Sequence, residues 1–246
     1  MNIHFLNCNK EDFLNLKYIY KYVTLDVFLN MLKKNYIYMA NPQEWKDPYE
    51  SRLLMQKYVF NENGEPEQYP FKDKLFATCF TSPSSCEAQW NMYSKNEPAV
   101  QISFKIETLL EELLKNEGPD LYIGQVKYFN TVNGNNIKDE IRAILGNVIP
   151  PTTEDWLRIM LLKRSPYSYE REIRFLAIKE NEKELHLKFT DITSAIDKVT
   201  LDPDDSNICN HIEEVDELLS VKGIRMSKSI LYKRPKNLKP IEIYNK

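Results

Sequence analysis

Two glutamates and an arginine recur at every second position within residues 165–178, whose sequence is SPYSYEREIRFLAI. In an extended strand, successive side chains point to opposite faces, so Ser168, Glu170, Glu172 and Arg174 would share one face. That face becomes apolar towards the end of the segment. Two carboxylates beside a guanidinium could take part in charge-based chemistry. Taken alone, however, the pattern favours a simpler interpretation, a solvated strand end with a Glu–Arg pair.

The composition is that of a globular protein without the common nucleotide-binding motifs. The chain has 246 residues, of which 42% are hydrophobic and 28% charged, so it is long enough to bury a core. The formal net charge is −3, so the chain lacks the excess of basic residues that is typical of nucleic-acid-binding proteins. Only 6 glycines are present, and neither G-x-G-x-x-G nor G-x-x-x-x-G-K-[ST] occurs.

Cysteine usage and hydropathy predict no metal site and no membrane segment. The 4 cysteines form no C-x-x-C pair. Cys209 and His211 are neighbours but would point apart on a helix, so we expect no bound metal. The N-terminus lacks the charged lead and apolar run of a signal peptide, and no window approaches the length of a spanning helix. We therefore expect a soluble, cytoplasmic protein with free thiols and no contact with a membrane.

Strands and helices alternate irregularly around this segment, which predicts an α+β fold in one domain. We expect one domain over residues 1–246, with its core at about 18–232 and mixed, mostly antiparallel sheets flanked by several helices. Strands are predicted at residues 18–23, 36–40, 75–81, 99–104, 121–129, 165–178, 185–189, 198–201 and 224–226. Helices are predicted at 25–34, around 90–93, at 107–116, 137–145, after Thr152 and at 208–222.

The sequence predicts three further local features. Thr152 and Asp155 have the spacing of a helix capping box. Residues 185–189 are expected to form a hairpin with the strand at 165–178. Residues 45–50 are expected to form an ordered loop, since they combine aromatic side chains with Asp-Pro.

A series of short motifs in a fixed order resembles a known bacterial family. WKDPYE at residues 45–50 resembles F-N-D-P-F-E, and CFT at 79–81 resembles C-F-S. They are followed by W-x-x-Y at 90–93, VQISF at 100–104, Y-x-Y-E-x-E-x-R at 167–174, VTLDP at 199–203 and GIRMSKS at 223–229. Together these motifs resemble the family catalogued as domain of unknown function twenty-nine seventy-one. The resemblance extends over most of the chain.

The order of the elements is also similar to that of ADP-ribosyltransferases. The chain has an early strand with a polar residue, followed by a helix and a second strand. Much later comes a strand that bears E-x-E. This order suggests the split sheet of those enzymes. The resemblance implies NAD as the cofactor and Glu172 as the catalytic glutamate, with Glu170 as its partner. It further implies ribose or ring contacts from Lys21, Tyr22, Trp90, Tyr93 and Arg174, with Asp47 and Glu50 holding the loop or facing the acceptor.

Several functional interpretations stay open. The first is an NAD-using ADP-ribosyltransferase-like enzyme, a bacterial toxin or phage-defence effector that modifies a protein or nucleic acid and has an antitoxin or defence-system partner. The second is a Mg²⁺-dependent nuclease that uses Asp47, Glu50, Glu170 and Glu172, with Lys163 nearby. The third is a non-enzymatic module that binds a nucleotide or a protein in an aromatic-rich pocket.

Overall fold

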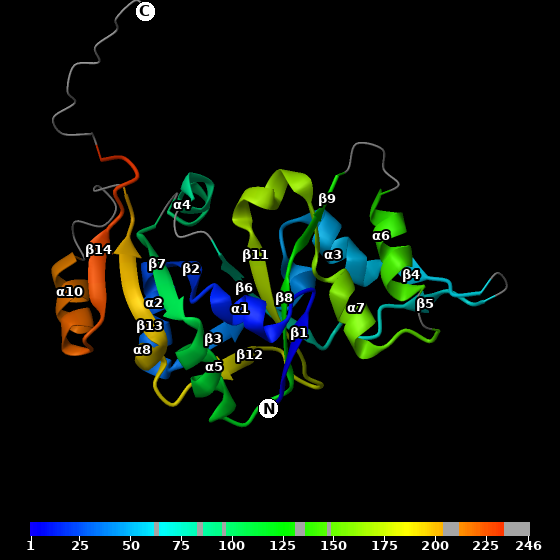
Figure 1. Ribbon diagram of the computed structural model, residues 1–246, viewed down its shortest axis with the longest axis horizontal. Helices are drawn as coiled ribbons and strands as arrows, with labels where there is room; N and C mark the ends of the chain where they lie inside the picture. Colours follow the sequence, from blue (N-terminus) through cyan, green and yellow to red (C-terminus); the bar gives the residue numbers. More distant parts are fainter. Residues whose placement is uncertain are drawn as a thin grey trace, which may run out of the picture.

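A mixed eight-stranded sheet forms the centre of the protein (Figure 1). The computed structural model describes residues 1–61, 64–82, 86–94, 97–130, 136–146, 149–203 and 212–233. Strands β1 and β8 are parallel, as are β13 and β14, and the other pairs in the sheet are antiparallel. In spatial order, the strands are β1 (Ile3–Leu6), β8 (Leu121–Gln125), β11 (Glu172–Ile178), β6 (Leu75–Thr81), β2 (Tyr18–Thr24), β7 (Ala99–Lys105), β13 (Ile196–Leu201) and β14 (Arg225–Lys228).

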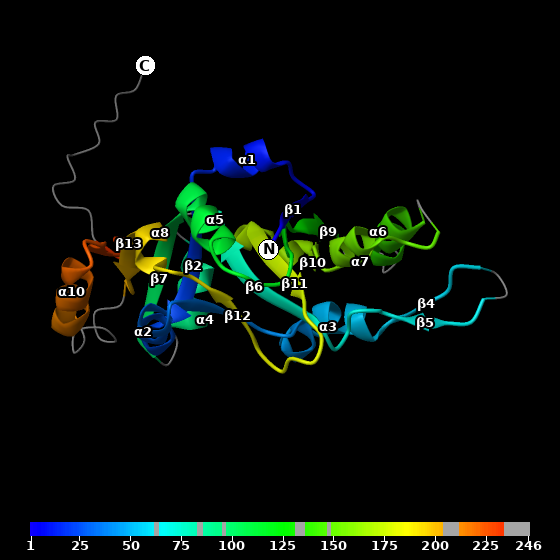
Figure 2. The ribbon, with the colours of Figure 1, turned by 90° about the horizontal axis from the view of Figure 1, so that it is seen from below.

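Helices cover both faces of the sheet, as Figure 2 shows: α1 and α5 lie on one side, and α2 and α4 on the other. The central strands β6, β7 and β11 are therefore buried almost throughout. The apolar runs of β6 and β11 reflect this, whereas β7 alternates apolar with polar residues and also buries Gln101 and Ser103. The helices are α1 (Lys10–Asn15), α2 (Leu25–Lys34), α3 (Pro48–Met55), α4 (Glu87–Tyr93), α5 (Ile106–Leu114), α6 (Asn136–Leu145), α7 (Thr153–Ile159), α8 (Ile192–Ala195) and α10 (Ile212–Val221).

Smaller elements surround this framework. The described residues also form three two-stranded sheets. They pair β3 (Tyr36–Met39) with β12 (Leu185–Lys188), β4 (Lys57–Tyr58) with β5 (Glu67–Gln68), and β9 (Lys127–Phe129) with β10 (Leu162–Arg164). Two 3₁₀ helices, η1 (Pro42–Glu44) and η2 (Ser165–Glu170), precede α3 and β11. Among the described residues, no helix is long and apolar enough to cross a membrane.

The sheet is split between β2 and β6. These neighbouring strands share the single residue pair Tyr20–Thr81, whereas β2 pairs with β7 from Tyr18 to Thr24. The halves β1-β8-β11-β6 and β2-β7-β13-β14 therefore diverge from one point of contact. The prediction of an α+β fold with a mixed sheet and flanking helices is confirmed, and the sheet is divided as the resemblance to ADP-ribosyltransferases implied.

The predicted strand over residues 165–178 is only half correct. Residues Ser165–Glu170 form the 3₁₀ helix η2, and the strand begins at Glu172. A proline at the start of a helical turn is favourable, because its φ angle is already set and no amide donor is lost. Arg171 then adopts a left-handed φ of 41°, which ends the turn and redirects the chain. Ser168 and Glu170 therefore do not share a strand face with Glu172.

Two further expectations about this region are wrong. Residues 185–189 do not pair with β11, because β6 and β8 already occupy both of its edges; β12 pairs with β3 instead. Residues 45–50 are not one loop, since α3 begins at Pro48. The Asp47 side chain caps this helix by accepting a hydrogen bond from the Tyr49 amide at 2.9 Å.

Other boundaries differ in ways that have local causes. The predicted strand at 121–129 breaks at Val126, whose amide donates to the carbonyl of Glu172 at 3.0 Å, so that β9 pairs with β10 instead. Strand β1 and helix α1 were not predicted, although Leu6 and Phe13 are fully buried. The capping box of Thr152 and Asp155 is present. Cys209, His211 and the start of the helix predicted at 208–222 lie outside the described residues.

Gly124 in β8 lies where the sheet meets the segment after α7. A Cβ atom added there would lie 2.3 Å from Leu161 Cδ1 and 2.9 Å from the Leu6 carbonyl oxygen. We expect Gly124→Ala to lower the free energy of unfolding by about 1–3 kcal/mol, because the backbone of β1 cannot move aside easily. Urea unfolding measures this. Gly118→Ala is the control, since its Cβ would meet only the far end of the Met1 side chain, which can change rotamer. Equal losses in both variants would contradict the expectation.

Candidate functional site

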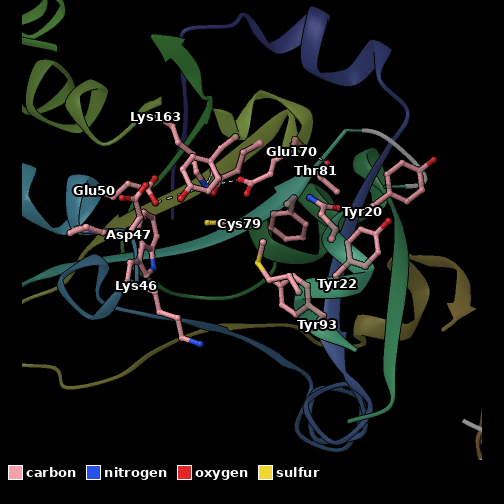
Figure 3. Close-up of a pocket in the computed structure, with 17 residues that line it drawn as sticks. Tyr20, Tyr22, Lys46, Asp47, Glu50, Cys79, Thr81, Tyr93, Lys163 and Glu170 are labelled. Carbon is pink, nitrogen blue, oxygen red and sulfur yellow. Dashed lines mark hydrogen bonds and ion pairs between the residues drawn. The ribbon is translucent and has the colours of Figure 1, made fainter. Parts of the chain in front are cut away.

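A cavity of about 480 Å³ opens at the split in the sheet (Figure 3). Tyr22 and Tyr93 lie on one side of it, Glu50, Asp47 and Lys163 lie on the other, and Cys79 lies between. The lining residues come from β2, from β6, from α4, from the segment around α3 and from residues 163–172. They are Tyr20, Tyr22, Trp45, Lys46, Asp47, Pro48, Glu50, Cys79, Phe80, Thr81, Gln89, Met92, Tyr93, Lys163, Tyr167, Glu170 and Glu172.

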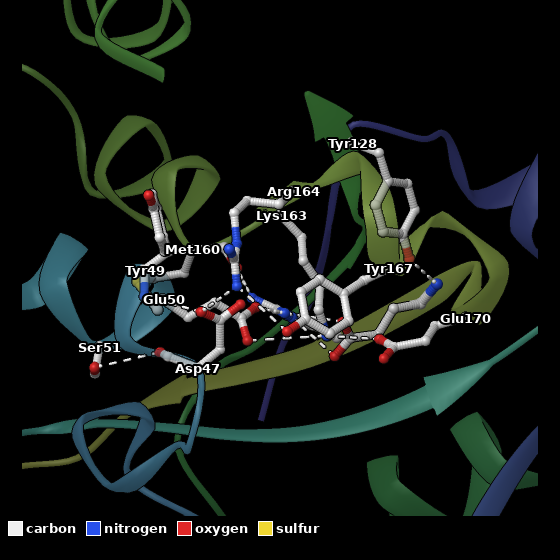
Figure 4. Close-up of polar contacts among 12 residues, drawn as sticks. Asp47, Tyr49, Glu50, Ser51, Tyr128, Met160, Lys163, Arg164, Tyr167 and Glu170 are labelled. Atoms are coloured by element: carbon white, nitrogen blue, oxygen red, sulfur yellow. Dashed lines mark hydrogen bonds and ion pairs between the residues drawn. The ribbon is translucent and has the colours of Figure 1, made fainter. Parts of the chain in front are cut away.

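Buried charges form one wall of the cavity (Figure 4). Lys163 Nζ donates to Glu170 Oε2 at 2.6 Å and to Glu172 Oε2 at 3.1 Å, and it lies 3.9 Å from Glu50 Oε2. The Lys163 ammonium also lies 5.0 Å from the centre of the Tyr167 ring. One cation thus holds three carboxylates together, although they come from α3, η2 and β11.

Arg174 supports this wall from behind. Its Nε donates to Glu172 Oε1 at 3.0 Å and its Nη2 to Glu172 Oε2 at 2.9 Å, while Nη2 also contacts Glu50 Oε1. Nη1 donates to the carbonyl of Met160 at 2.5 Å, and the guanidinium lies 4.5 Å from the centre of the Trp45 ring. Both oxygens of Glu172 are therefore committed to bonds within the protein.

Among the residues that ion pairs join, the cluster carries one more negative charge than positive, and the buried Lys21 outside these pairs also interacts electrostatically with Glu172. Three carboxylates, Glu50, Glu170 and Glu172, face two cations, Lys163 and Arg174. Among the described residues, Glu170 is held by Lys163 through Oε2 alone, whereas Glu50 and Glu172 also contact Arg174. The surplus negative charge is therefore least compensated at Glu170, at the edge of the cavity.

The two glutamates of the E-x-E motif have pKa values that shift in opposite directions. Burial raises the pKa of Glu170 above its usual value, and Lys163 offsets this only in part. Burial would also raise the pKa of Glu172, but Arg174 and Lys163 outweigh it and lower that pKa to about 2. Glu172 is thus a fixed negative charge at neutral pH, while Glu170 is the easier of the two to protonate.

The opposite wall is aromatic. The rings of Tyr22 and Tyr93 stack with their centres 6.1 Å apart and their planes 20° apart. Trp90 packs edge-on against Tyr22 at 4.9 Å, and Gln101 donates to the Tyr22 hydroxyl at 2.6 Å. These contacts fix Tyr22 and support Tyr93, which remains 39% exposed. A flat apolar surface of this kind suits a planar ring.

A third group of contacts lies next to the cavity residues Asp47 and Glu172. Arg164 Nη2 donates to Asp47 Oδ1 at 3.0 Å, and the guanidinium lies 4.1 Å from the centre of the Tyr49 ring and 5.3 Å from that of Tyr167. Asp47 therefore both caps α3 and holds Arg164. Tyr128 steadies the start of β11, because its hydroxyl accepts a hydrogen bond from the Glu172 amide at 2.8 Å.

The structure brings most of the predicted site residues together, but three of them lie outside the cavity lining. Tyr22, Asp47, Glu50, Tyr93, Glu170 and Glu172 line the cavity. Trp90 and Arg174 are buried behind the walls. Lys21 Nζ donates to Thr78 Oγ1 at 2.8 Å and to the Cys79 carbonyl at 3.0 Å, so it bridges the two halves of the sheet instead.

Several lining residues were not predicted as part of the favoured site. Lys163 was considered only for a nuclease, because it lies seven and nine residues before the two glutamates and the turn at η2 that brings them together was not predicted. Gln89 and Met92 lie in the same short helix as Tyr93, and Tyr20 alternates with Tyr22 on β2. Helical periodicity would have identified Gln89 as a neighbour of Tyr93, and strand periodicity Tyr20 as a neighbour of Tyr22. Met92 directly precedes Tyr93, so neither periodicity points to it.

The described residues contain no group of three His, Cys, Asp or Glu side chains arranged to hold a metal ion. The three clustered glutamates surround Lys163 and Arg174, and these cations occupy the space between the carboxylates.

Comparisons with known proteins agree with the resemblance in the sequence. The family described as "Protein of unknown function (DUF2971)" matches residues 89–175, which include the cavity residues from Gln89 to Glu172. A search of curated proteins found no match.

Solved structures of DarT from Thermus sp. 2.9 are similar over 87% of this chain and 95% of theirs. The complex with NAD⁺ has 13% identity and a TM-score of 0.39. The complex with ADP-ribosylated ssDNA has 12% identity and a TM-score of 0.40. At such low identity and TM-score, the function has to be inferred from the cavity itself.

Arg174 should be essential for stability. Arg174→Met would leave Glu172 and Glu50 buried without their guanidinium partner, so we expect the free energy of unfolding to fall by about 3–5 kcal/mol in urea at neutral pH. Arg225→Met is the matched control, because Arg225 pairs with Asp197 at the surface and should matter little. Similar losses in the two variants would contradict a supporting role for Arg174.

Glu172 should make the fold sensitive to acid. Because its pKa is lowered on folding to about 2, its ionised form stabilises the fold above the unfolded value of about 4.3, and this stabilisation is lost as the pH falls towards 2. Burial raises the pKa of Glu170, so the contribution of Glu170 to the stability of the fold changes with pH in the opposite direction.

We therefore expect the stability difference between wild type and Glu172→Gln to be large at pH 7 and to narrow steadily below about pH 4.3. Thermal unfolding across this pH range measures the difference, with Glu44→Gln, an exposed change outside the cavity, as the control. A gap that stays constant with pH would contradict the expectation.

Proposed function

We propose that the protein binds NAD in the cavity at the sheet split and transfers its ADP-ribose group to an acceptor. One observation carries this proposal: a single cavity has stacked tyrosines on one side and a buried cluster with surplus negative charge on the other. The cavity volume lies in the range of small-molecule sites. NAD combines a flat cationic ring with the sugar at which the reaction occurs, and the two walls complement these two parts.

The electrostatics suit cleavage of the N-glycosidic bond. As that bond breaks, its electron pair leaves with the nicotinamide, and positive charge develops on the ribose. A carboxylate that is already ionised and fixed stabilises this charge without reorganisation. Glu172, held by Arg174 and Lys163, meets both conditions. The proposal thus assigns Glu172 the role of a fixed negative charge.

Glu170 is suited to proton transfer. The acceptor forms its new bond to the ribose carbon and must lose a proton when it does so. A carboxylate with a raised pKa is a better base than an ordinary one, and Glu170 has an oxygen that Lys163 does not bind. The proposal therefore assigns Glu170 the role of receiving the acceptor's proton.

The wider biological setting belongs to the same proposal. The acceptor would be a protein or a nucleic acid, and the reaction would take place in the cytoplasm. A toxin or phage-defence effector that consumes NAD would require control by an antitoxin or another defence-system component. Residues 1–246 would act as one domain.

Turnover of labelled NAD tests the activity. We expect wild-type protein to release nicotinamide or to transfer label, and Glu172→Gln to reduce the rate at least about 100-fold, since it removes the fixed charge. Glu170→Gln should reduce transfer to an acceptor while leaving NAD binding nearly unchanged. Glu44→Gln, which neutralises an exposed glutamate outside the cavity, is the control and should retain full activity.

Each alternative function predicts a different result. If NAD does not bind at millimolar concentration, the proposal fails. Cleavage of nucleic acid that requires Mg²⁺ would establish the nuclease instead. NAD binding without turnover, equal in wild type and in both glutamate variants, would indicate a non-enzymatic binding module.

A further inference from the structure

Gln89 in α4 has a side-chain oxygen that the described residues leave without a hydrogen-bond partner. The residue lines the cavity and is only 7% exposed, and no group in the described part of the chain forms a hydrogen bond with its buried Oε1 atom. Buried amides in proteins are almost always hydrogen-bonded, so each exception calls for an explanation. An unsatisfied amide in the wall of a cavity is explained if a ligand in that cavity supplies the missing bonds.

Its surroundings indicate what kind of ligand group this is. Gln89 and Tyr93 are four residues apart in α4, so both side chains project from the same face of the helix. Tyr93 stacks with Tyr22, and both rings line the cavity. The free amide therefore lies beside a flat aromatic surface, and the complementary ligand is a planar ring that carries a polar substituent.

Hydrogen-bond complementarity indicates the chemical identity of this polar substituent. A glutamine side chain offers one carbonyl acceptor and an NH₂ donor group, and its two ends exchange places by rotation about the last side-chain torsion. The group that satisfies both ends is another carboxamide. A carboxylate has only acceptors, so it would leave the glutamine oxygen unpaired.

We propose that Gln89 recognises the carboxamide of the nicotinamide ring and makes the site selective for NAD over analogues that lack this amide. This inference rests on the proposed function, since it places the nicotinamide at the Tyr22–Tyr93 wall. Gln89 is a specificity residue in this arrangement and takes no part in breaking the glycosidic bond.

Three ligands separate this role from a merely structural one. They are NAD, the analogue in which a carboxylate replaces the carboxamide, and ADP-ribose, which has no nicotinamide. Calorimetric titration of wild type and Gln89→Met gives the affinity for each ligand. Gln56→Met is the matched control, because Gln56 is exposed and lies outside this cavity.

We expect wild type to bind NAD about tenfold or more tightly than the carboxylate analogue, as one lost hydrogen bond predicts. Gln89→Met should reduce this preference severalfold while leaving the affinity for ADP-ribose unchanged. The negative cluster disfavours the carboxylate analogue in both proteins, so the change in preference between them is the decisive measurement. Gln56→Met should keep the wild-type preference.

Each other outcome has a definite meaning. An unchanged preference in Gln89→Met would overturn the assignment while leaving the proposed function intact. If Gln89→Met weakens the binding of all three ligands equally, Gln89 only shapes the cavity, and this result would also overturn the assignment. If wild type binds neither NAD nor ADP-ribose, the proposed function fails, and the inference fails with it.

Discussion

The burial of the Arg174 guanidinium is the constraint on which the rest of the site depends. Arg174 is 0% exposed, so its charge is stable only if the surrounding groups compensate it fully. Glu172 on β11, Glu50 on α3 and the carbonyl of Met160 after α7 provide that compensation. Three segments that are distant in sequence are therefore held at one point. Loss of these contacts together would leave the buried Arg174 charge uncompensated, and this favours one fixed arrangement of the three segments.

This arrangement also creates the surplus charge. Arg174 pairs with both Glu50 and Glu172, and Lys163 forms ion pairs with all three carboxylates. The turn at η2 and the left-handed Arg171 return Glu170 to the same ammonium as Glu172. Alternate side chains on one straight strand lie on a common face nearly 7 Å apart, whereas here one lysine binds both glutamates directly.

Local pattern and the spacing of motifs predicted the sheet well, because β6 is mostly apolar and β7 alternates apolar with polar residues. They could not predict the partner of β12, since strand pairing depends on which edges remain free after the sheet has formed. The 3₁₀ turn was missed because a charged alternation outweighed the signal from Pro166. Periodicity could have corrected Lys21, since it alternates with Tyr20 and Tyr22 and must therefore point to the opposite face.

The structure also changes the comparison between the two glutamates. Order of motifs alone favoured Glu172, and it could not show that both oxygens of that residue are bonded to Arg174 and Lys163. A carboxylate held in this way is poorly placed to accept a proton and well placed to act as a permanent charge. Glu170 keeps an oxygen free of Lys163 and has a raised pKa. In the proposed reaction, Glu172 therefore acts as the fixed charge and Glu170 as the base. The buried arginine determines this assignment, because it binds Glu172 and not Glu170.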